Sequence, residues 1–363
     1  MEKIPDHGGN LYNAARKTGR SVEDWLDFSA NINPLGLAGC ISQVLVQSIP
    51  RIIHYPDPDA FELKRILSRR YGVEEACITA GNGAVELLYI LCHVLKPRRV
   101  LIPAPSFGEY ERAARAAGAE INYILLKDAD GFLLTAASVI EKLPGTDMVF
   151  IGNPNNPTGT ILTNRVLEEI IEAAGKTGTV VVLDESFIDF LPDDAPFTCR
   201  SLLSRYPNLV ILHSLTKFYA IPGLRLGFSL TSPDLAQKLH AAKDPWNVNS
   251  LAQAAGIAAL EDEEYGRRSR SLVQQANKSM YEGLQKIAGF KPFPPAVNYI
   301  LVHTGNRRTA VEMQQSLLAY GILIRDCSNY PGLSPAYIRV AVKRPAQNQV
   351  LLDTLQNIAG EEK

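Results

Sequence analysis

The sequence lacks the signatures of several protein classes. Its 363 residues include five cysteines, an odd number, widely spaced and without a CxxC pair, so neither a disulfide framework nor a thiolate zinc site is indicated. No apolar run reaches the length of a membrane span, and the opening residues MEKIPDHGGN show no basic head followed by an apolar stretch. We therefore expect a cytoplasmic protein in a reducing compartment, without a membrane partner or a bound metal.

The chain also lacks an excess of charge of either sign. Its formal net charge is −1 and its pI is near 6.6, which gives no electrostatic reason to expect nucleic acid or an acidic membrane surface as partner. A content of 46% hydrophobic and 21% charged residues is ordinary for a soluble globular enzyme, and the length allows two domains.

From about residue 77, short apolar runs alternate with amphipathic stretches. The runs are ACITAG, RVLIPAPSF, MVFIGNP, TVVVLDESF and LVILHSL, and helical patterns between them cover 84–94, 109–117 and 164–174. This alternation predicts an α/β fold with a mostly parallel sheet covered by helices on both faces. We assign this large domain to residues 50–246.

Residues 1–49 and 247–363 are predicted to form a smaller α+β domain. A helical region over about 250–287 is followed by the strand candidates NYILVH, GILIRD and YIRVAV. The N-terminal segment is too short to fold alone. We expect it to pack with the C-terminal part or across a subunit interface.

Ligands of parallel α/β sheets bind beyond the carboxyl ends of the strands, so the residues after each run are candidates for a site. Gly81, Asn82 and Gly83 follow the first run and precede a predicted helix, whose N-terminus could bind a phosphate. An ordinary turn explains the same three residues. In NPNNPTG, residues 153–159, two prolines stiffen a loop that either is only rigid or presents the amide of Asn156 to a ligand.

Asp184 follows the four apolar residues of the run TVVVL. An unpaired carboxylate at the mouth of a buried strand would be unfavourable in free energy. It needs a cationic partner, which could be Arg225, Lys217 or a protonated heteroaromatic nitrogen. The segment SLTKFYAIPGLRLGF, residues 214–228, places Lys217 just past the last strand among apolar neighbours. A desolvated lysine there has a lowered pKa and is nucleophilic, although most lysines at strand ends simply reach water.

Ser214, Thr216 and Arg225 supply hydroxyls and a guanidinium suited to a phosphate beside that amine. A phosphate site, a carboxylate, an amide and a lysine in this order together describe a pocket for pyridoxal 5′-phosphate. On these motifs the chain resembles the fold-type I pyridoxal-phosphate enzymes of the aspartate aminotransferase superfamily. The resemblance implies Lys217 bonded to the cofactor aldehyde, Asp184 at the pyridine nitrogen, Asn156 at the 3′ oxygen, and Gly81, Asn82, Gly83, Ser214, Thr216 and Arg225 around the phosphate.

Two aromatic residues are implied by the same resemblance. Phe107, in PAPSF, matches the position that stacks on the cofactor ring, and Tyr55, in HYPD, matches a tyrosine that reaches the cofactor phosphate of a neighbouring subunit. A homodimer is therefore expected. Phe187 departs from the pattern, because aminotransferases of the histidinol-phosphate type usually have a tyrosine there that contacts the 3′ oxygen.

The motifs HGGN (7–10), DFSANINPLG (27–36), DESFIDF, PWNVN and ILIRDCSNYPGL resemble the L-threonine-O-3-phosphate decarboxylases of cobalamin biosynthesis. That resemblance implies loss of CO2 from threonine phosphate to give (R)-1-amino-2-propanol O-2-phosphate. A histidinol-phosphate aminotransferase, a decarboxylase preferring serine phosphate and a regulatory module that only binds the cofactor are the alternatives. The sequence gives neither the orientation of the scissile bond nor the choice between threonine and serine phosphate.

A substrate with a carboxylate and a phosphate needs at least two cationic anchors. Arg339, in YIRVAV, matches the arginine that binds the α-carboxylate across the superfamily. The candidates for the other substrate contacts are His7, Asn31, Asn33, Asn156 and Arg325. Trp246 and Asn247 are expected near the entrance, where Trp246 could equally be a packing residue.

Overall fold

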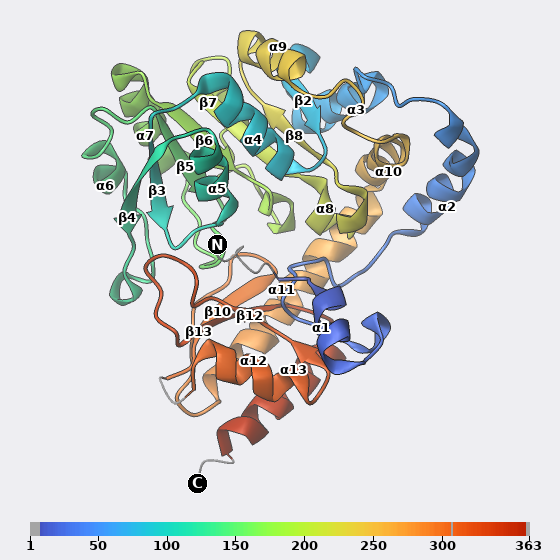
Figure 1. The fold of residues 1–363 in the computed structure, drawn as a ribbon, viewed down its shortest axis with the longest axis vertical. Coiled ribbons are helices and arrows are strands. Elements are labelled where there is room, and N and C mark those ends of the chain that lie inside the picture. Colours follow the sequence, from blue (N-terminus) through green and yellow to red (C-terminus); the bar gives the residue numbers. More distant parts are fainter. Residues whose placement is uncertain (1–7, 306–307, 361–363) are drawn as a thin grey trace.

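The computed structural model describes residues 8–305 and 308–360, and it is built around a seven-stranded sheet (Figure 1). Strand β8 runs antiparallel to both of its neighbours, while the other neighbouring strands run parallel. The strands in spatial order are β2 (Ile78–Gly81), β8 (Gly227–Leu230), β7 (Leu209–Ser214), β6 (Val180–Asp184), β5 (Met148–Gly152), β3 (Arg99–Ala104) and β4 (Glu120–Leu125).

Both faces of this sheet are covered, because successive side chains of each apolar strand point to opposite sides. Val182 and Leu212 pack in one cluster with α4 (Ala84–Leu95), α5 (Glu109–Ala116) and α9 (Pro233–Ala242). Leu183 and Ile211 pack on the opposite face with α3 (Phe61–Tyr71), α7 (Asn164–Thr177) and α10 (Ser250–Glu261). The short helix α6 (Ala136–Ile140) packs beside α7. The predicted α/β architecture, a mostly parallel sheet covered by helices on both faces, is therefore confirmed.

Two strands of the seven-stranded sheet were missed by the sequence pattern. Strand β4 lies at the edge of the sheet, where exposed residues alternate with half-buried or buried ones, and Asn122 interrupts its apolar residues. Strand β8 begins at Gly227, inside the SLTKFYAIPGLRLGF segment, and is only four residues long. The predicted helical region over 250–287 is two helices, because Asp262 caps the start of α11 (Glu263–Gln285) by accepting from the N–H of Tyr265.

A second, antiparallel sheet contains β12 (Arg325–Asp326), β13 (Tyr337–Ala341), β10 (Tyr299–His303) and β9 (Lys291–Pro292) in that order. Figure 1 places it in the lower half of the molecule, together with α12 (Ala310–Leu318) and α13 (Pro345–Gly360). Residues of α11, α12 and α13 share one apolar cluster with its strands. No helix in the described part of the chain is long and apolar enough to cross a membrane.

The N-terminal segment is tied to the C-terminal part by a parallel pair of short strands, β1 (Leu26–Asp27) and β11 (Ile322–Leu323). Helix α1 (Leu11–Thr18) precedes this pair, whereas α2 (Gly39–Ser48) packs against α10 beside the large sheet. Residues 8–48 therefore pair with the C-terminal part of the chain through β1 and pack against a helix of the large sheet through α2. The division into domains at residues 50 and 247 stays a prediction.

Candidate active site

A cavity lies at the carboxyl ends of the parallel strands, where ligands of α/β sheets bind. Phe107 follows β3, Asn156 follows β5, Asp184 ends β6 and Lys217 follows β7, and all four line this cavity with Phe187. Four of the residues predicted from separate motifs therefore face one space.

Lys217 lies in α8 (Leu215–Phe218), a single turn that begins as soon as β7 ends. Its Nζ donates to Oγ of Ser214 at 3.1 Å, and that oxygen lies 2.7 Å from Oγ1 of Thr216. Burial lowers the pKa of Lys217 to about 8, against the attraction of the Asp184 carboxylate and with a smaller contribution from Arg225. A far larger share of this amine than of an ordinary lysine is therefore neutral, and hence nucleophilic, near neutral pH.

The lowered pKa of Lys217 predicts how the protein captures an aldehyde. Only the neutral amine attacks, and its fraction rises with pH until the pH exceeds the pKa of about 8. The rate at which cofactor-free protein binds pyridoxal should therefore rise about tenfold per pH unit below pH 7 and level off above pH 9. Stopped-flow absorbance measures it, with pyridoxal chosen because it has no titrating phosphate. A rate that keeps rising to pH 10.5 would contradict the burial of the amine.

Asp184 is held by neutral donors and not by a cation. Its Oδ2 accepts from the hydroxyl of Tyr110 at 2.8 Å, and its Oδ1 accepts from the N–H of Ser186 at 3.0 Å. The structure shows no ion pair between Asp184 and Lys217 or Arg225, all three being in the described part of the chain. The carboxylate is thus available to a cationic nitrogen of a ligand. Tyr110 was missed by the sequence reasoning, although its place in α5, three residues after Phe107, was a signal.

Gly81, Asn82 and Gly83 lead from β2 into α4, so the N-terminus of α4 opens toward the strand ends. A Cβ at Gly83, where φ is +84°, would collide with the guanidinium of Arg225. A Cβ at Gly227 would lie 2.5 Å from the N atom of Ala84. The glycines therefore let a cation and a neighbouring strand approach the start of a helix, which is the arrangement of a phosphate site.

Arg339, on β13, connects the small sheet to the cavity. Its Nη1 donates to Oδ1 of Asn156, and its Nη2 donates to the carbonyl of Ser29 at 2.7 Å. The guanidinium lies 5.5 Å from the ring centre of Tyr299. Its Nε is buried and has no hydrogen-bond partner among the described residues. An anionic ligand in the cavity would satisfy this arginine.

Arg325 and Arg339 are directly opposite each other on β12 and β13. Side chains opposite each other in a sheet point to the same face. The two arginines are 7% and 5% exposed, so two cations are buried side by side. Arg325 donates to Oδ1 of Asn329 at 3.0 Å and lies over the ring of Tyr330. Neither arginine forms an ion pair within the described residues, so the pair favours a ligand that carries negative charge.

Arg325 also lines a small cavity that contains Gly8 and Ser29. His7, predicted as a substrate contact, lies outside the described residues. Its neighbour Gly8 lines the same cavity as Arg325. The N–H of Gly9 donates to Oγ of Ser29, which also lines this cavity, at 2.7 Å. The beginning of the described chain therefore folds toward Arg325.

The two asparagines of NINP behave differently. Asn31 is buried, and its Oδ1 has no hydrogen-bond partner in the described structure. Asn33 is fully engaged, because its Nδ2 donates to the carbonyl of Phe218 and to Oγ of Ser269, while its Oδ1 accepts from the N–H of Leu35. Both N–H donors of the Asn33 amide are therefore used within the protein, which leaves none for a substrate phosphate. The predicted substrate contact of Asn33 stays a prediction.

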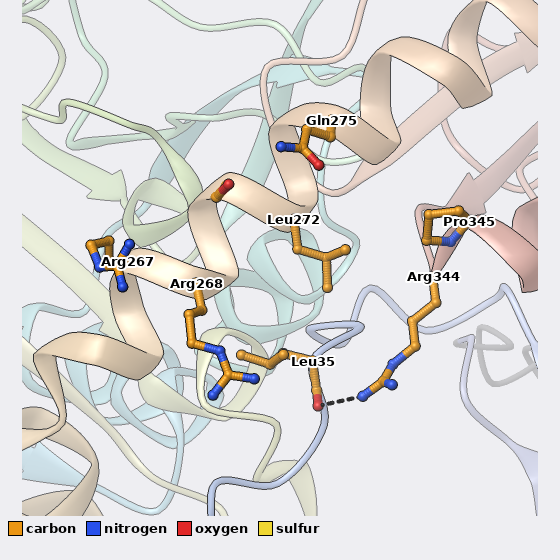
Figure 2. A pocket seen from close by; sticks show the side chains of 8 residues that line it. Leu35, Arg267, Arg268, Leu272, Gln275, Arg344 and Pro345 are labelled. Atoms are coloured by element: carbon orange, nitrogen blue, oxygen red, sulfur yellow. Dashed lines mark hydrogen bonds between the residues drawn. The ribbon is translucent and has the colours of Figure 1, made fainter.

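The loop around Asn33 instead holds the backbone of the reactive lysine. The N–H of Asn33 donates to the carbonyl of Lys217 at 3.0 Å. Arg344 fixes the far side of this loop by donating from Nη2 to the carbonyl of Leu35 at 3.0 Å, as Figure 2 shows, and from Nε to the carbonyl of Pro34. The loop thus links the end of β13 to the turn that carries Lys217.

Tyr55 lies outside the cavity and is 77% exposed. Its ring stacks on Trp246, with ring centres 4.4 Å apart. Asn247 donates to Oε2 of Glu86 at 2.6 Å, in the first turn of α4. An entrance role for Trp246 and Asn247 stays a prediction. Among the described residues, no three His, Cys, Asp or Glu side chains converge as a metal site would require.

Comparison with known proteins places these residues in a family. The model of aminotransferase class I and II matches residues 23–355. The chain belongs to this family. It is 40% identical to a threonine-phosphate decarboxylase of Salmonella typhimurium over 97% of this chain and 96% of that protein. It is 33% identical to an adenosylcobalamin biosynthesis bifunctional protein of Leptospira interrogans, over 98% of this chain and 41% of that one.

A solved structure of the same family is similar throughout. The histidinol-phosphate aminotransferase of Clostridium acetobutylicum superposes with a TM-score of 0.86 and 29% identity, covering 92% of this chain and 99% of that one. This likeness confirms the predicted fold class, that of the type I pyridoxal-phosphate transferases. The reaction must be argued from the site and from the sequence relatives, because the backbone does not distinguish one reaction from another.

Proposed function

We propose that this protein decarboxylates L-threonine O-3-phosphate, with pyridoxal 5′-phosphate as cofactor, to (R)-1-amino-2-propanol O-2-phosphate and CO2 in cobalamin biosynthesis. The observation that carries the proposal is the buried pair Arg325 and Arg339, opposite each other on β12 and β13. Threonine phosphate carries a carboxylate and a phosphate, one for each guanidinium. The 40% identity to a threonine-phosphate decarboxylase over nearly the whole chain supports the same reaction.

The residues present fit pyridoxal 5′-phosphate. A buried amine with a pKa of about 8, a carboxylate held only by neutral donors and a helix start that glycines keep open to Arg225 occur together at one end of the sheet. Lys217 would bond to the aldehyde, Asp184 would pair with the pyridine nitrogen, and Gly81 to Gly83 with Arg225 would hold the phosphate. When bound, the cofactor withdraws electrons from Cα of the amino acid that it carries.

The protein's own groups then decide the reaction. Arg339 would hold the α-carboxylate, and Arg325 and Asn31 would hold the substrate phosphate, so the substrate is fixed at both ends. Once CO2 has left, Lys217 would supply a proton to Cα. The ring of Phe187 faces this amine, with Nζ 5.8 Å from the ring centre. An apolar ring at this position donates no hydrogen bond, so it adds no competing proton donor.

A histidinol-phosphate aminotransferase is the second candidate, because a protein of that name has the same fold with a TM-score of 0.86. A phosphorylated substrate would suit Arg325 equally. Phe187 argues against this candidate, since the aminotransferases that the motifs resemble have a tyrosine there. Arg339 alone does not separate the two candidates, because the 2-oxoglutarate that such an aminotransferase would use also has a carboxylate for this arginine to bind.

We also propose a homodimer in which Tyr55 reaches the cofactor phosphate of the partner subunit. Val46, Ile49, Ile52 and Ile53 are each more than half exposed, and they run along α2 and the turn that leads to Tyr55. An exposed apolar surface of this kind marks a protein interface. A second copy of this chain is the occupant that gives exposed Tyr55 a partner. Sedimentation should give twice the mass of 39.8 kDa.

The substrate assignment can be tested by comparing kcat/KM for L-threonine O-phosphate, L-serine O-phosphate and L-threonine. Removing one methyl group costs only about 1–3 kcal/mol in an apolar pocket. Removing the phosphate leaves Arg325 buried without its ligand and should cost more, about 2–5 kcal/mol. Equal turnover of threonine and its phosphate would contradict the role of Arg325.

A further inference from the structure

Glu86, in the first turn of α4, reaches back to the loop that is proposed to hold the cofactor phosphate. Its Oε2 accepts from the N–H of Asn82 at 2.6 Å. The same oxygen accepts from Nδ2 of Asn247 at 2.6 Å. A carboxylate at a helix N-terminus is favoured by the helix dipole, and hydrogen bonds to a charged acceptor are strong. Glu86 thus fixes the turn Asn82–Gly83 from the side and ties it to residue 247.

Asn247 continues the connection away from the cavity. Its Oδ1 accepts from Nζ of Lys243 at 2.8 Å, and the same ammonium donates to the carbonyl of Pro58 at 3.1 Å. Burial lowers the pKa of Lys243, and the carboxylate of Glu86 opposes that effect. Glu86, Asn247 and Lys243 therefore form a hydrogen-bonded network that connects the phosphate loop to the segment that contains Pro58.

The segment 55–58 is the one that carries Tyr55. Tyr55 stacks on Trp246, the residue before Asn247, with an angle of 25° between the rings. Nε2 of Gln253 donates to the carbonyl of Asp57 at 2.9 Å. Tyr55 is thus positioned by the same connection, residues 243–253, that Glu86 anchors through Asn247.

We propose that Glu86 is a positioning residue that couples the phosphate loop of one subunit to Tyr55, which serves the cofactor of the other subunit. The inference rests on the proposed function and its dimer. Glu86 touches neither the cofactor nor the substrate in this account. It acts through Asn82 in its own site and through Asn247, Trp246 and Tyr55 in the partner's site.

Loss of Glu86 should weaken cofactor binding in both sites. Hydrogen bonds to a charged group contribute enough that removing the carboxylate should raise the dissociation constant of the cofactor about tenfold in its own site. The effect on the partner's site passes through one side chain and a ring stack. We expect the dissociation constant of the cofactor to rise about threefold to tenfold in the partner's site.

Heterodimers separate the two effects. One subunit carries Lys217→Ala, and the other carries Tyr55→Ala under a different affinity tag. One of the two sites then has Lys217 from the second subunit and Tyr55 from the first, and only this site gives the visible absorbance band of lysine-bound cofactor. Adding Glu86→Ala to the Lys217→Ala subunit changes the residue only on the side that supplies Tyr55.

The readout is the dissociation constant of pyridoxal 5′-phosphate for that site, taken from the absorbance band. Glu86→Ala on the Tyr55 side should raise it threefold to tenfold, and Asn247→Leu on the same side should do the same. Glu86→Gln keeps the acceptor oxygen and should restore most of the affinity. Glu282→Ala, which removes an exposed glutamate of α11 that has no hydrogen-bond or ion-pair partner within residues 8–305 and 308–360, is the matched control and should change nothing.

Two results would overturn the coupling, and they are distinguishable. If the heterodimer without a change at Glu86 binds the cofactor no more tightly at that site than the same heterodimer with Tyr55→Ala in both subunits, Tyr55 is not shared between subunits and the proposed dimer arrangement is wrong as well. If that site forms but Glu86→Ala and Asn247→Leu leave its dissociation constant within twofold, the dimer stands and Glu86 does not position Tyr55.

Discussion

Replacing Lys217 by alanine is expected to abolish turnover, by at least about 10⁴-fold, and to remove the pH-dependent visible absorbance band of the bound cofactor. The amine would be both the group that bonds to the cofactor aldehyde and the group that returns a proton to Cα, so no other side chain can replace it. Among the described residues that line the cavity, no other is a lysine. Steady-state assays and absorbance spectra at pH 6 to 9 measure the two losses.

A matched control removes a lysine without touching the site. Lys176, in α7, is exposed and pairs with Glu172 at 2.9 Å. Lys176→Ala should leave both the spectrum and the rate unchanged, because an exposed pair of this kind contributes little. A Lys217→Ala protein that keeps the band would refute the assignment of Lys217.

Replacing Arg339 by alanine should lower kcat/KM for L-threonine O-phosphate by about 30-fold to several thousand-fold, mainly through a higher KM. Removing one member of a buried, hydrogen-bonded charge pair costs about 2–5 kcal/mol. Arg339→Lys should restore little of it, since the guanidinium donates to Asn156 and to Ser29 from two different nitrogens and an ammonium cannot span both.

The control for Arg339 is Arg165→Ala, which removes an exposed arginine of α7. Initial rates over a range of threonine phosphate concentrations separate KM from kcat for each variant. Kinetics of Arg339→Ala that match those of Arg165→Ala would remove Arg339 from the substrate site. A fall in kcat with unchanged KM would instead mean that Arg339 acts only in the transition state.

The parts of the site that the sequence predicted well are those encoded in short contiguous motifs. Asp184 ends a buried strand, and Asn156 and Lys217 follow buried strands by four and three residues. Parallel strands bring such positions to one edge of the sheet. Their convergence on one cavity follows from the strand order alone. The fold class was predictable for the same reason, because continuous apolar runs identify strands buried on both faces.

The remaining features depend on contacts between distant segments. The opposition of Arg325 and Arg339 is set by the register of β12 against β13, which no local pattern discloses. Asn31 and Asn33 are two residues apart in one motif, and only the structure shows that the amide oxygen of Asn31 has no partner among the described residues while both amide hydrogens of Asn33 are used. The bond from Tyr110 to Asp184 joins residues 74 apart in the chain. Periodicity cannot reveal such contacts.

The most direct test of the central claim is to give the cofactor-loaded protein L-threonine O-phosphate labelled with ¹³C in the carboxyl group and with ¹⁵N in the amino group, without any keto acid. The account predicts many turnovers of labelled CO2 together with an equal amount of aminopropanol phosphate that keeps its ¹⁵N. No CO2, combined with turnover once histidinol phosphate and 2-oxoglutarate are supplied, would contradict it and identify an aminotransferase.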